Sequence, residues 1–427
     1  MNPLRRSVVL FSLACALVAT GAGSSMAAAT ALDDVVAGTS GVKLGSLVDS
    51  GTRLGPSDPG GADFFGSNVA IEEDLAVVGA FNADNALGAA YVFERKKGVW
   101  VEQTKLVATD RLVNSEFGEN VSISGNTIAI GAPSDRNGRG AVYIFQKTGN
   151  VWSQQAKLTA NDETEDSFFG DSIALRDDVL VSGAELGLVP GGVEAGAAYV
   201  FRRIGKSWTQ EAKLIASDPT GQANFGSGTA IVSDNTIAIG AASAQVSGVV
   251  YFFERQGGVW LEQSRLVPSS PEEGQGFGIN IGSSGNSLVV GAYSAATTGG
   301  VRTGAAYVYR RTGAAWAEEA RLVPSETQVR LFATRVAISG STVVAGAPFD
   351  DSGTPEGGSA WVFQRVGNAW VTTAKLKAPD ATPNDVFGGY VAIDGTTILI
   401  GAEQADRPPP AEANEGAAYV FNLDGKF

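Results

Sequence analysis

The sequence predicts an all-β protein, a single seven-bladed β-propeller of four-stranded antiparallel blades. Three observations predict this fold. A unit of about 50 residues recurs seven times, each unit holds four short strand signals, and the N-terminal segment matches the one strand that the last unit lacks. Because ring closure removes exposed sheet edges, we expect residues 45–427 to form one domain.

The repeat is defined by small and aromatic residues at fixed spacing. Phe-Gly begins at Phe65, Phe117, Phe169, Phe225, Phe277 and Phe387, with Phe332-Ala333 as a degenerate seventh copy. Gly-Ala follows at Gly79, Gly131, Gly183, Gly240, Gly291, Gly346 and Gly401, and a Gly-x-x-aromatic run follows at Gly88, Gly140, Gly196, Gly248, Gly304, Gly358 and Gly416. Six units add a tryptophan and then a Leu preceded by Lys or Arg. Residues that recur in every unit are expected to serve blade packing.

The second unit illustrates the four strands. Val121–Ile123 and Thr127–Ile130 alternate apolar with polar residues around a Ser-Gly-Asn turn. Ala141–Phe145 is apolar throughout and predicts a strand buried on both faces. A turn at 147–150 then leads to Val151–Leu158, a mostly polar strand that should be outermost.

The two ends of the chain predict how the ring closes. The seventh unit stops at Phe427, before its tryptophan and fourth strand. The segment VDSGTRL (Val48–Leu54) aligns with WVEQTKL (Trp100–Leu106), and Leu54 precedes Phe65 by the same 11 residues that separate Leu106 from Phe117. We therefore expect the N-terminal strand to complete the last blade.

Composition restricts the site chemistry and the location. Residues 1–31 are typical of a secretory signal peptide, followed by a short linker at 32–44, so the chain is expected to be exported to the periplasm, cell surface or medium. The only cysteine, Cys15, lies in the leader and leaves a lipoprotein signal as the competing interpretation.

The rest of the chain has neither Cys nor His, which excludes disulfides, Cys/His zinc sites and His-based nucleophile systems. Without Arg5 and Arg6 the formal charge changes from −14 to −16, which disfavours nucleic acid and anionic lipid as partners. No later segment is long and apolar enough to span a membrane, and a monomer is expected.

The frame from Phe117-Gly118 to Gly131-Ala132-Pro133 resembles the FG-GAP repeat of the integrin α-subunit propeller, and the pattern KLxAxD, FG and GAAYVF resembles its bacterial relatives. The resemblance covers Val42 to Phe427 and implies an extracytoplasmic propeller with a binding or adhesion role. It also implies calcium in the first-to-second-strand loop. Here the equivalent turns, such as Ser124–Asn126, are too short to place the oxygen ligands that calcium needs.

Loop lengths predict where a ligand would bind. The loop between the second and third strands is the one that varies widely, from six residues (Ala242–Ser247) to thirteen (Glu403–Glu415), and it should share a face with the blade-to-blade linkers. Either this variation serves binding or the loops are simply unconstrained. The candidate ligand-binding residues there are Asp84, Asp135, Glu185, Asp350, Asp351, Glu403 and Asp406, and Asp135, Asn137, Asp350 and Asp351 are weak candidates to hold calcium. No other cofactor is expected.

An acidic residue also recurs in the linkers, four residues after the Leu. Its members are Asp58, Asp110, Asp162, Asp218, Glu326 and Asp380, with Ser270 in one unit. We expect these side chains to fix turns by accepting backbone N–H bonds, the alternative being a ring of cation ligands.

The leading functional prediction is a non-catalytic binding or adhesion propeller that recognises a protein or a polysaccharide through its variable loops. One alternative is a glycoside hydrolase-like enzyme with two carboxylates, although no GxSxG, HExxH or phosphate-loop motif is present. A structural surface protein is the other alternative.

Overall fold

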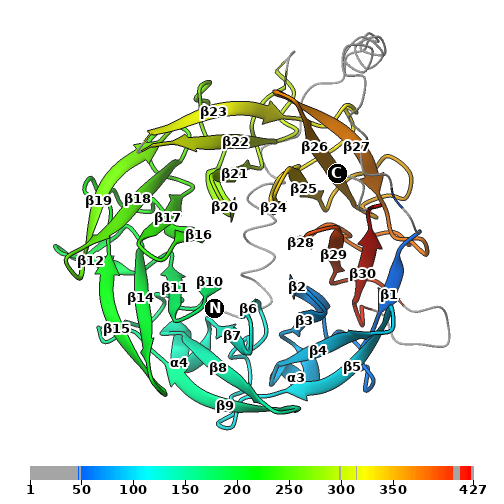
Figure 1. Ribbon diagram of the computed structural model, residues 1–427, viewed down its shortest axis with the longest axis horizontal. Coiled ribbons are helices and arrows are strands. Elements are labelled where there is room, and N and C mark those ends of the chain that lie inside the picture. The colour runs from blue at the N-terminus through cyan, green and yellow to red at the C-terminus, as the bar shows by residue number, and fades with distance from the viewer. Residues whose placement is uncertain are drawn as a thin grey trace.

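The computed structural model describes residue 47 and residues 50–162, 164–297, 300–313, 315–406 and 414–424. The predicted signal peptide and linker lie outside these residues. Seven four-stranded antiparallel sheets form a ring, as Figure 1 shows in a view down the short axis. The predicted seven-bladed β-propeller is therefore confirmed.

The blades follow one another in chain order. Blade 1 contains β2 (Phe65–Glu72), β3 (Leu75–Ala80), β4 (Ala89–Lys96) and β5 (Val99–Leu106), and blade 2 contains β6 (Asn120–Ser124), β7 (Thr127–Ala132), β8 (Ala141–Thr148) and β9 (Val151–Leu158). Blade 3 contains β10 (Ser172–Arg176), β11 (Val179–Ala184), β14 (Ala197–Ile204) and β15 (Ser207–Leu214), and blade 4 contains β16 (Phe225–Ser233), β17 (Thr236–Ala241), β18 (Val249–Gln256) and β19 (Val259–Leu266). Blade 5 contains β20 (Phe277–Ser284), β21 (Ser287–Ala292), β22 (Ala305–Thr312) and β23 (Ala315–Leu322), and blade 6 contains β24 (Val336–Ser339), β25 (Thr342–Ala347), β26 (Ser359–Val366) and β27 (Ala369–Leu376). Blade 7 contains β28 (Tyr390–Asp394), β29 (Thr397–Ala402), β30 (Ala417–Asn422) and β1 (Thr52–Leu54).

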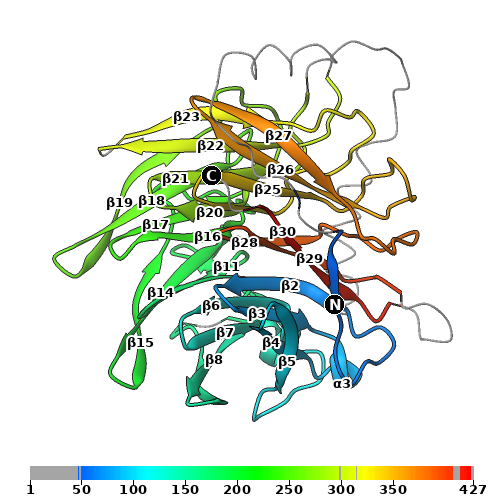
Figure 2. The same ribbon diagram turned by 45° about the vertical axis from the view of Figure 1, so that its right-hand side comes forward.

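Strand β1 closes the ring by pairing with β30, so the blue and red ends of the described chain meet in Figures 1 and 2. Arg53 lies opposite Tyr419, and Leu54 opposite Ala418. The equivalent pairs in blade 1 are Lys105 with Tyr91 and Leu106 with Ala90. The register predicted from the repeat is therefore confirmed, although the regular strand is shorter than the aligned segment.

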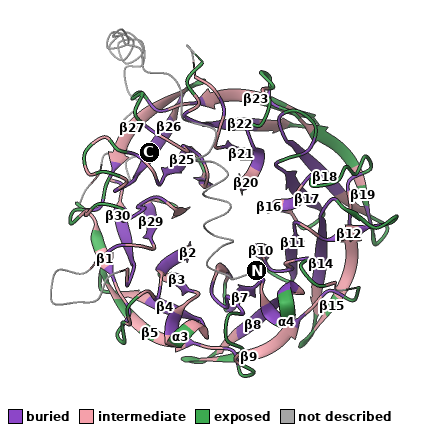
Figure 3. Cartoon of the chain, turned by 180° about the vertical axis from the view of Figure 1, so that it is seen from behind, coloured by how far each residue is buried: buried purple, intermediate pink, exposed green. Residues whose placement is uncertain are grey.

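The core consists of seven apolar clusters, one at each blade junction. The third strands are buried on both faces, and the outermost strands are largely half-buried or exposed, as the pink and green ribbons of Figure 3 show. Within a blade, the Phe of Phe-Gly packs edge-on against the tyrosine of the third strand, as Phe117 does on Tyr143 with 5.2 Å between ring centroids. Packing accounts for these recurrent aromatics.

The first-to-second-strand turns brace neighbouring blades on one face of the ring. At six junctions a residue in or next to the turn hydrogen-bonds the adjacent blade, and the pairs are Glu72 with Gly125, Ser124 with Asp177, Arg176 with Val232, Ser284 with Gly340, Ser339 with Gly395, and Asp394 with Glu73. Between blades 4 and 5 the bond joins the strand residues Ser283 and Ile231. Here the turns connect one blade to the next.

The second-to-third-strand loops lie on the other face together with the linkers, as the chain geometry predicts. Asn114 of a linker donates its backbone N–H to Ala86 O of the preceding loop, and Asp166 donates to Asn137 O in the same way. Short segments α3 (Ala83–Ala86) and α4 (Asp135–Gly138) occupy two of these loops, and both contain left-handed residues. Because they span only one turn, no helical periodicity in the sequence could predict them.

Candidate functional site

The recurrent Lys or Arg before the last Leu of each blade holds the loop face together. Lys105 Nζ lies 2.8 Å from both Asp58 of the preceding linker and Asp84 of the loop. Lys157 likewise bridges Asp110 at 2.7 Å and Asp135 at 2.9 Å. One cation thus ties a linker carboxylate to a loop carboxylate, an arrangement that we call the blade clamp.

The clamp recurs with substitutions around the ring. Lys375 bridges Glu326 at 2.5 Å and Asp350 at 2.7 Å in blade 6. Arg53 contacts Asp380 at 2.6 Å and Asp406 O at 3.1 Å in blade 7, and Arg265 contacts Asp218 at 2.6 Å in blade 4. In blade 5, where Ser270 replaces the acidic residue, Arg321 donates to Tyr307 and to Ala296 O and lies 3.9 Å from Glu272 of the linker. The remaining clamp cation, Lys213 of blade 3, is described below.

The linker acids therefore serve structure, but not mainly through backbone N–H bonds as expected. Their principal donors are the clamp cation and the third-strand tyrosine, as in Asp58 with Tyr91 at 2.9 Å and Asp380 with Tyr419 at 2.7 Å. The sequence showed the Asp, Tyr and Lys or Arg of each unit as separate recurrences. Their pairing was missed because the partners lie far apart in the chain, as Lys157 and Asp110 do.

Several predicted site residues belong to the clamp and are hydrogen-bonded. Asp135 is fully buried, and its two carboxylate oxygens accept from Arg136, Tyr143 and Lys157. Asp350 is 2% exposed and accepts from Ser352, Ser359 and Lys375. Asp84 accepts from Lys105 and Arg111. A cation at any of these carboxylates would have to displace a resident ammonium or guanidinium group.

The other predicted residues do not converge on one place. Asp351 pairs with Arg330 at 3.1 Å, Glu185 is buried beside Asn224, and Asp406 accepts from the backbone N–H of Asn414. Asn137 has a left-handed backbone, and its carbonyl oxygen accepts from Asp166. Within the described part of the chain, no three metal-ligating side chains of Asp, Glu, His or Cys come together.

Glu403 is the most perturbed of the candidate acids. Withdrawal from water raises its pKa to about 7, and the charge of Arg335 opposes that shift. Arg335 stacks on Tyr390, with its guanidinium carbon 4.7 Å from the ring centroid. The charges of Asp171 and Glu119 also act on Arg335.

The clamp predicts how stability depends on pH. Burial raises the pKa of Asp84 and Asp350, but hydrogen bonds from Lys105 and Lys375, among others, outweigh it and hold both values below the ordinary one. Asp110, Asp162, Asp218 and Asp380 shift in the same direction. A lowered folded-state pKa gives stability that is present above the unfolded pKa and lost as the pH falls through the folded value. We expect the melting temperature to drop steeply below about pH 4.

Buried Asp63 and Asp385 have the opposite sign, because burial raises their pKa. Their contribution to stability is present at low pH and is lost as the pH rises through the folded-state pKa. They therefore flatten the rise of the melting temperature with pH above the acid transition. Melting curves from pH 7 to 2.5 measure both effects. The Asp350→Asn variant should show a shallower acid slope than the wild type, and an unchanged slope would contradict the clamp assignment.

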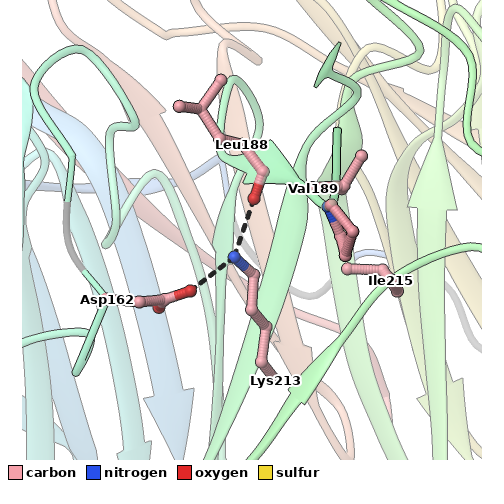
Figure 4. A pocket seen from close by; sticks show the side chains of 6 residues that line it. Asp162, Leu188, Val189, Lys213 and Ile215 are labelled. Atoms are coloured by element: carbon pink, nitrogen blue, oxygen red, sulfur yellow. Dashed lines mark hydrogen bonds and ion pairs between the residues drawn. The ribbon is translucent and has the colours of Figure 1, made fainter. Parts of the chain in front are cut away.

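Blade 3 departs from this arrangement. Its loop carries an extra hairpin, β12 (Leu188–Val189) and β13 (Val193–Glu194), around the turn Val189–Gly192. Gly191 has φ +95°, which suits the position after a proline in a type II turn. Beside the hairpin lies an open hollow of about 350 Å³, lined by Asp162, Leu188, Val189, Pro190, Lys213 and Ile215 (Figure 4).

The loops also differ in polarity around the ring, while the linker between blades 1 and 2 exposes Leu112 and Val113 on the same face, 42% and 62%. The loops of blades 3, 4 and 5 expose Val193, Val246 and Val301, which are 37%, 60% and 49% exposed. The loops of blades 1, 2 and 6 instead place their acidic residues in the clamp. In the described part of the chain, no helix is long and apolar enough to cross a membrane.

A family model described as "FG-GAP repeat" matches the chain seven times, at residues 50–93, 100–145, 152–201, 208–253, 260–309, 316–363 and 370–421. These segments run from the last strand of one blade into the next blade, so the matches fall on all seven blades. A search of curated proteins found no match.

Proposed function

Because this chain belongs to the FG-GAP repeat family, we propose that it is an exported, non-catalytic binding or adhesion propeller that contacts a protein through the loop face of blades 3 to 5. One observation carries the choice of face. Asp84, Asp135 and Asp350 of the loops of blades 1, 2 and 6 are engaged in the clamp, whereas Val193, Val246 and Val301 expose apolar side chains to solvent. Exposed apolar side chains gathered on one face favour a protein partner.

A polysaccharide is the second candidate ligand. Phe64 and Phe81 lie on the same face in blade 1, half-buried, with their rings stacked 5.2 Å apart and nearly parallel. Half-exposed rings can stack on sugars, so this pair favours a glycan. The proposal rests on the valines because they span three neighbouring loops. We propose no metal cofactor, and binding is expected to be insensitive to a chelator.

The test compares two triple variants against a panel of immobilised proteins and polysaccharides of defined composition. In the first, Val193, Val246 and Val301 are changed to Asp. In the matched control, Val99, Val151 and Val259 are changed to Asp; these are 62%, 66% and 59% exposed and follow third-to-fourth-strand turns on the opposite face. We expect the loop-face variant to lose at least about tenfold in affinity for a bound protein and the control to stay within about twofold.

Three results would contradict the proposal. Equal loss in both variants would remove the assignment to this face. Capture of polysaccharides alone, abolished by Phe81→Ala, would favour the glycan candidate. Turnover of a polysaccharide that depends on Glu403 would favour the hydrolase alternative.

A further inference from the structure

The clamp of blade 3 has lost one of its two carboxylates. Lys213 Nζ lies 2.6 Å from Asp162 of the linker, but its loop-side partner is the main-chain oxygen of Leu188 at 2.7 Å, as the dashed lines of Figure 4 show. In each of the other three blades whose clamp cation is lysine, two carboxylates flank the ammonium. The clamp of Lys213 therefore contains one carboxylate, where the other lysine clamps contain two.

Comparison with blade 1 places Leu188 where a loop carboxylate could stand. Leu188 stands five residues after Gly183, as Asp84 stands five residues after Gly79, whereas Asp135 and Asp350 stand four residues after their glycines, at the position of Gly187. An aliphatic residue thus stands where blade 1 has its loop carboxylate, and a hollow of about 350 Å³ lies beside the ammonium. This volume lies at the lower end of those that hold small ligands.

The walls of the hollow combine a charged pair, Lys213 with Asp162, and aliphatic surface. An ammonium has three N–H donors, and among the described residues two of those of Lys213 are used in hydrogen bonds. Its nitrogen also lies 5.5 Å from the centroid of the Tyr199 ring, as its equivalents do in blades 1 and 2. The remaining walls are Leu188, Val189, Pro190 and Ile215. A carboxylate attached to a compact aliphatic group matches both features.

We propose that this hollow binds the free C-terminal carboxylate of a partner protein whose last residue is aliphatic, with the carboxylate on Lys213 and the side chain against Leu188, Val189 and Ile215. Asp162 does not preclude a second carboxylate, because Lys105, Lys157 and Lys375 each accommodate two. Capture of a terminal carboxylate is a known route to peptide recognition. The inference rests on the proposed binding role of this face and names the chemistry of its partner.

The probe is a pool of fluorescein-labelled pentapeptides, randomised at the first four positions and ending in leucine, isoleucine or valine. It is compared with the same pool as C-terminal amides, using retention on the immobilised full chain and fluorescence polarisation of retained peptides. We expect the free acids to bind at least about tenfold tighter than the amides, because the amide removes a charge-assisted hydrogen bond. Equal binding of acids and amides would overturn the proposal.

Two variants locate the site. Leu188→Asp restores the loop carboxylate and should abolish peptide binding without removing the clamp. Lys213→Met should also abolish binding, and Lys157→Met is its matched control, because it breaks the same clamp in a blade whose loop carboxylate is present. Full binding by Leu188→Asp, or equal loss in both lysine variants, would overturn the assignment.

Two further outcomes separate this inference from the proposed function. If N-acetyl-leucine competes as strongly as the peptides, the site takes a small aliphatic carboxylate and the partner-terminus proposal is wrong. If no pentapeptide binds while the loop-face valine variant still loses protein capture, this inference fails and the proposed function stands.

Discussion

A chain that lacks residues 42–54 will not yield soluble, folded protein. The deletion removes β1, which forms the fourth strand of blade 7 and pairs with β30. It exposes the edge of β30, which invites edge-to-edge aggregation, and it removes Leu54, which is 4% exposed. Loss of a buried leucine alone costs about 2–5 kcal/mol, a large part of the stability of a typical domain.

The matched control is a chain that begins at residue 42 and keeps β1. We expect it to remain soluble and to show a cooperative thermal transition by circular dichroism and calorimetry. The single variant Arg53→Met separates the clamp from the strand. It removes the contacts with Asp380 and Asp406 O but keeps the pairing of β1, and it should lower the melting temperature without abolishing folding. A soluble, cooperatively folding 42–54 deletion would contradict closure by β1.

The Gly118→Ala variant will be strongly destabilised. Gly118 has φ +100°, and a Cβ atom there would lie 2.2 Å from the carbonyl oxygen of Ala89 in the neighbouring blade. A backbone atom cannot move aside as a flexible side chain can. The unfavourable φ and the forced separation of two blades together should cost at least about 3 kcal/mol, measured by urea denaturation.

Gly278→Ala is the control for the clash. Gly278 occupies the same place in blade 5 with φ +96°, but its added Cβ would lie 3.1 Å from Val249 O. Both variants suffer the same backbone strain, so their difference isolates the steric term. We expect Gly278→Ala to lose about 1–2 kcal/mol. Equal destabilisation of the two variants would show that φ alone, and not blade contact, requires these glycines.

Blade 6 shows how the fold accommodates the copy of the repeat that lacks the glycine of Phe-Gly. Ala333 replaces the glycine of Phe-Gly, is fully buried and has φ +63°. The first strand starts four residues after Phe332, against three residues after the Phe in blades 2, 3 and 7. The Ala333 N–H donates to Gly346 O as the Gly118 N–H donates to Gly131 O, so the blade is retained without the glycine.

The fold could be predicted from sequence because each feature is set by local chemistry repeated seven times. Glycines that meet a neighbouring backbone, such as Gly79 against Gly118 O, recur at fixed spacing, and an apolar third strand recurs between them. Even ring closure followed from local alignment, since Arg53 occupies the register of Lys105. The site could be predicted only in part. The sequence identified the variable loops and listed their acids, but it did not show which acids had cationic partners.

The sequence by itself determined the number of blades, the four-strand order, the closing strand and the exclusion of Cys and His chemistry from the repeats. Only the tertiary structure decided the role of the charges. Asp135 appeared as a calcium candidate in the sequence, yet it is buried against Lys157, and Arg53 pairs with Asp380, 327 residues away. Electrostatic partners are chosen by distance in space, and periodicity along the chain does not encode that distance. For the same reason, only the structure showed that Leu188 leaves Lys213 one carboxylate short.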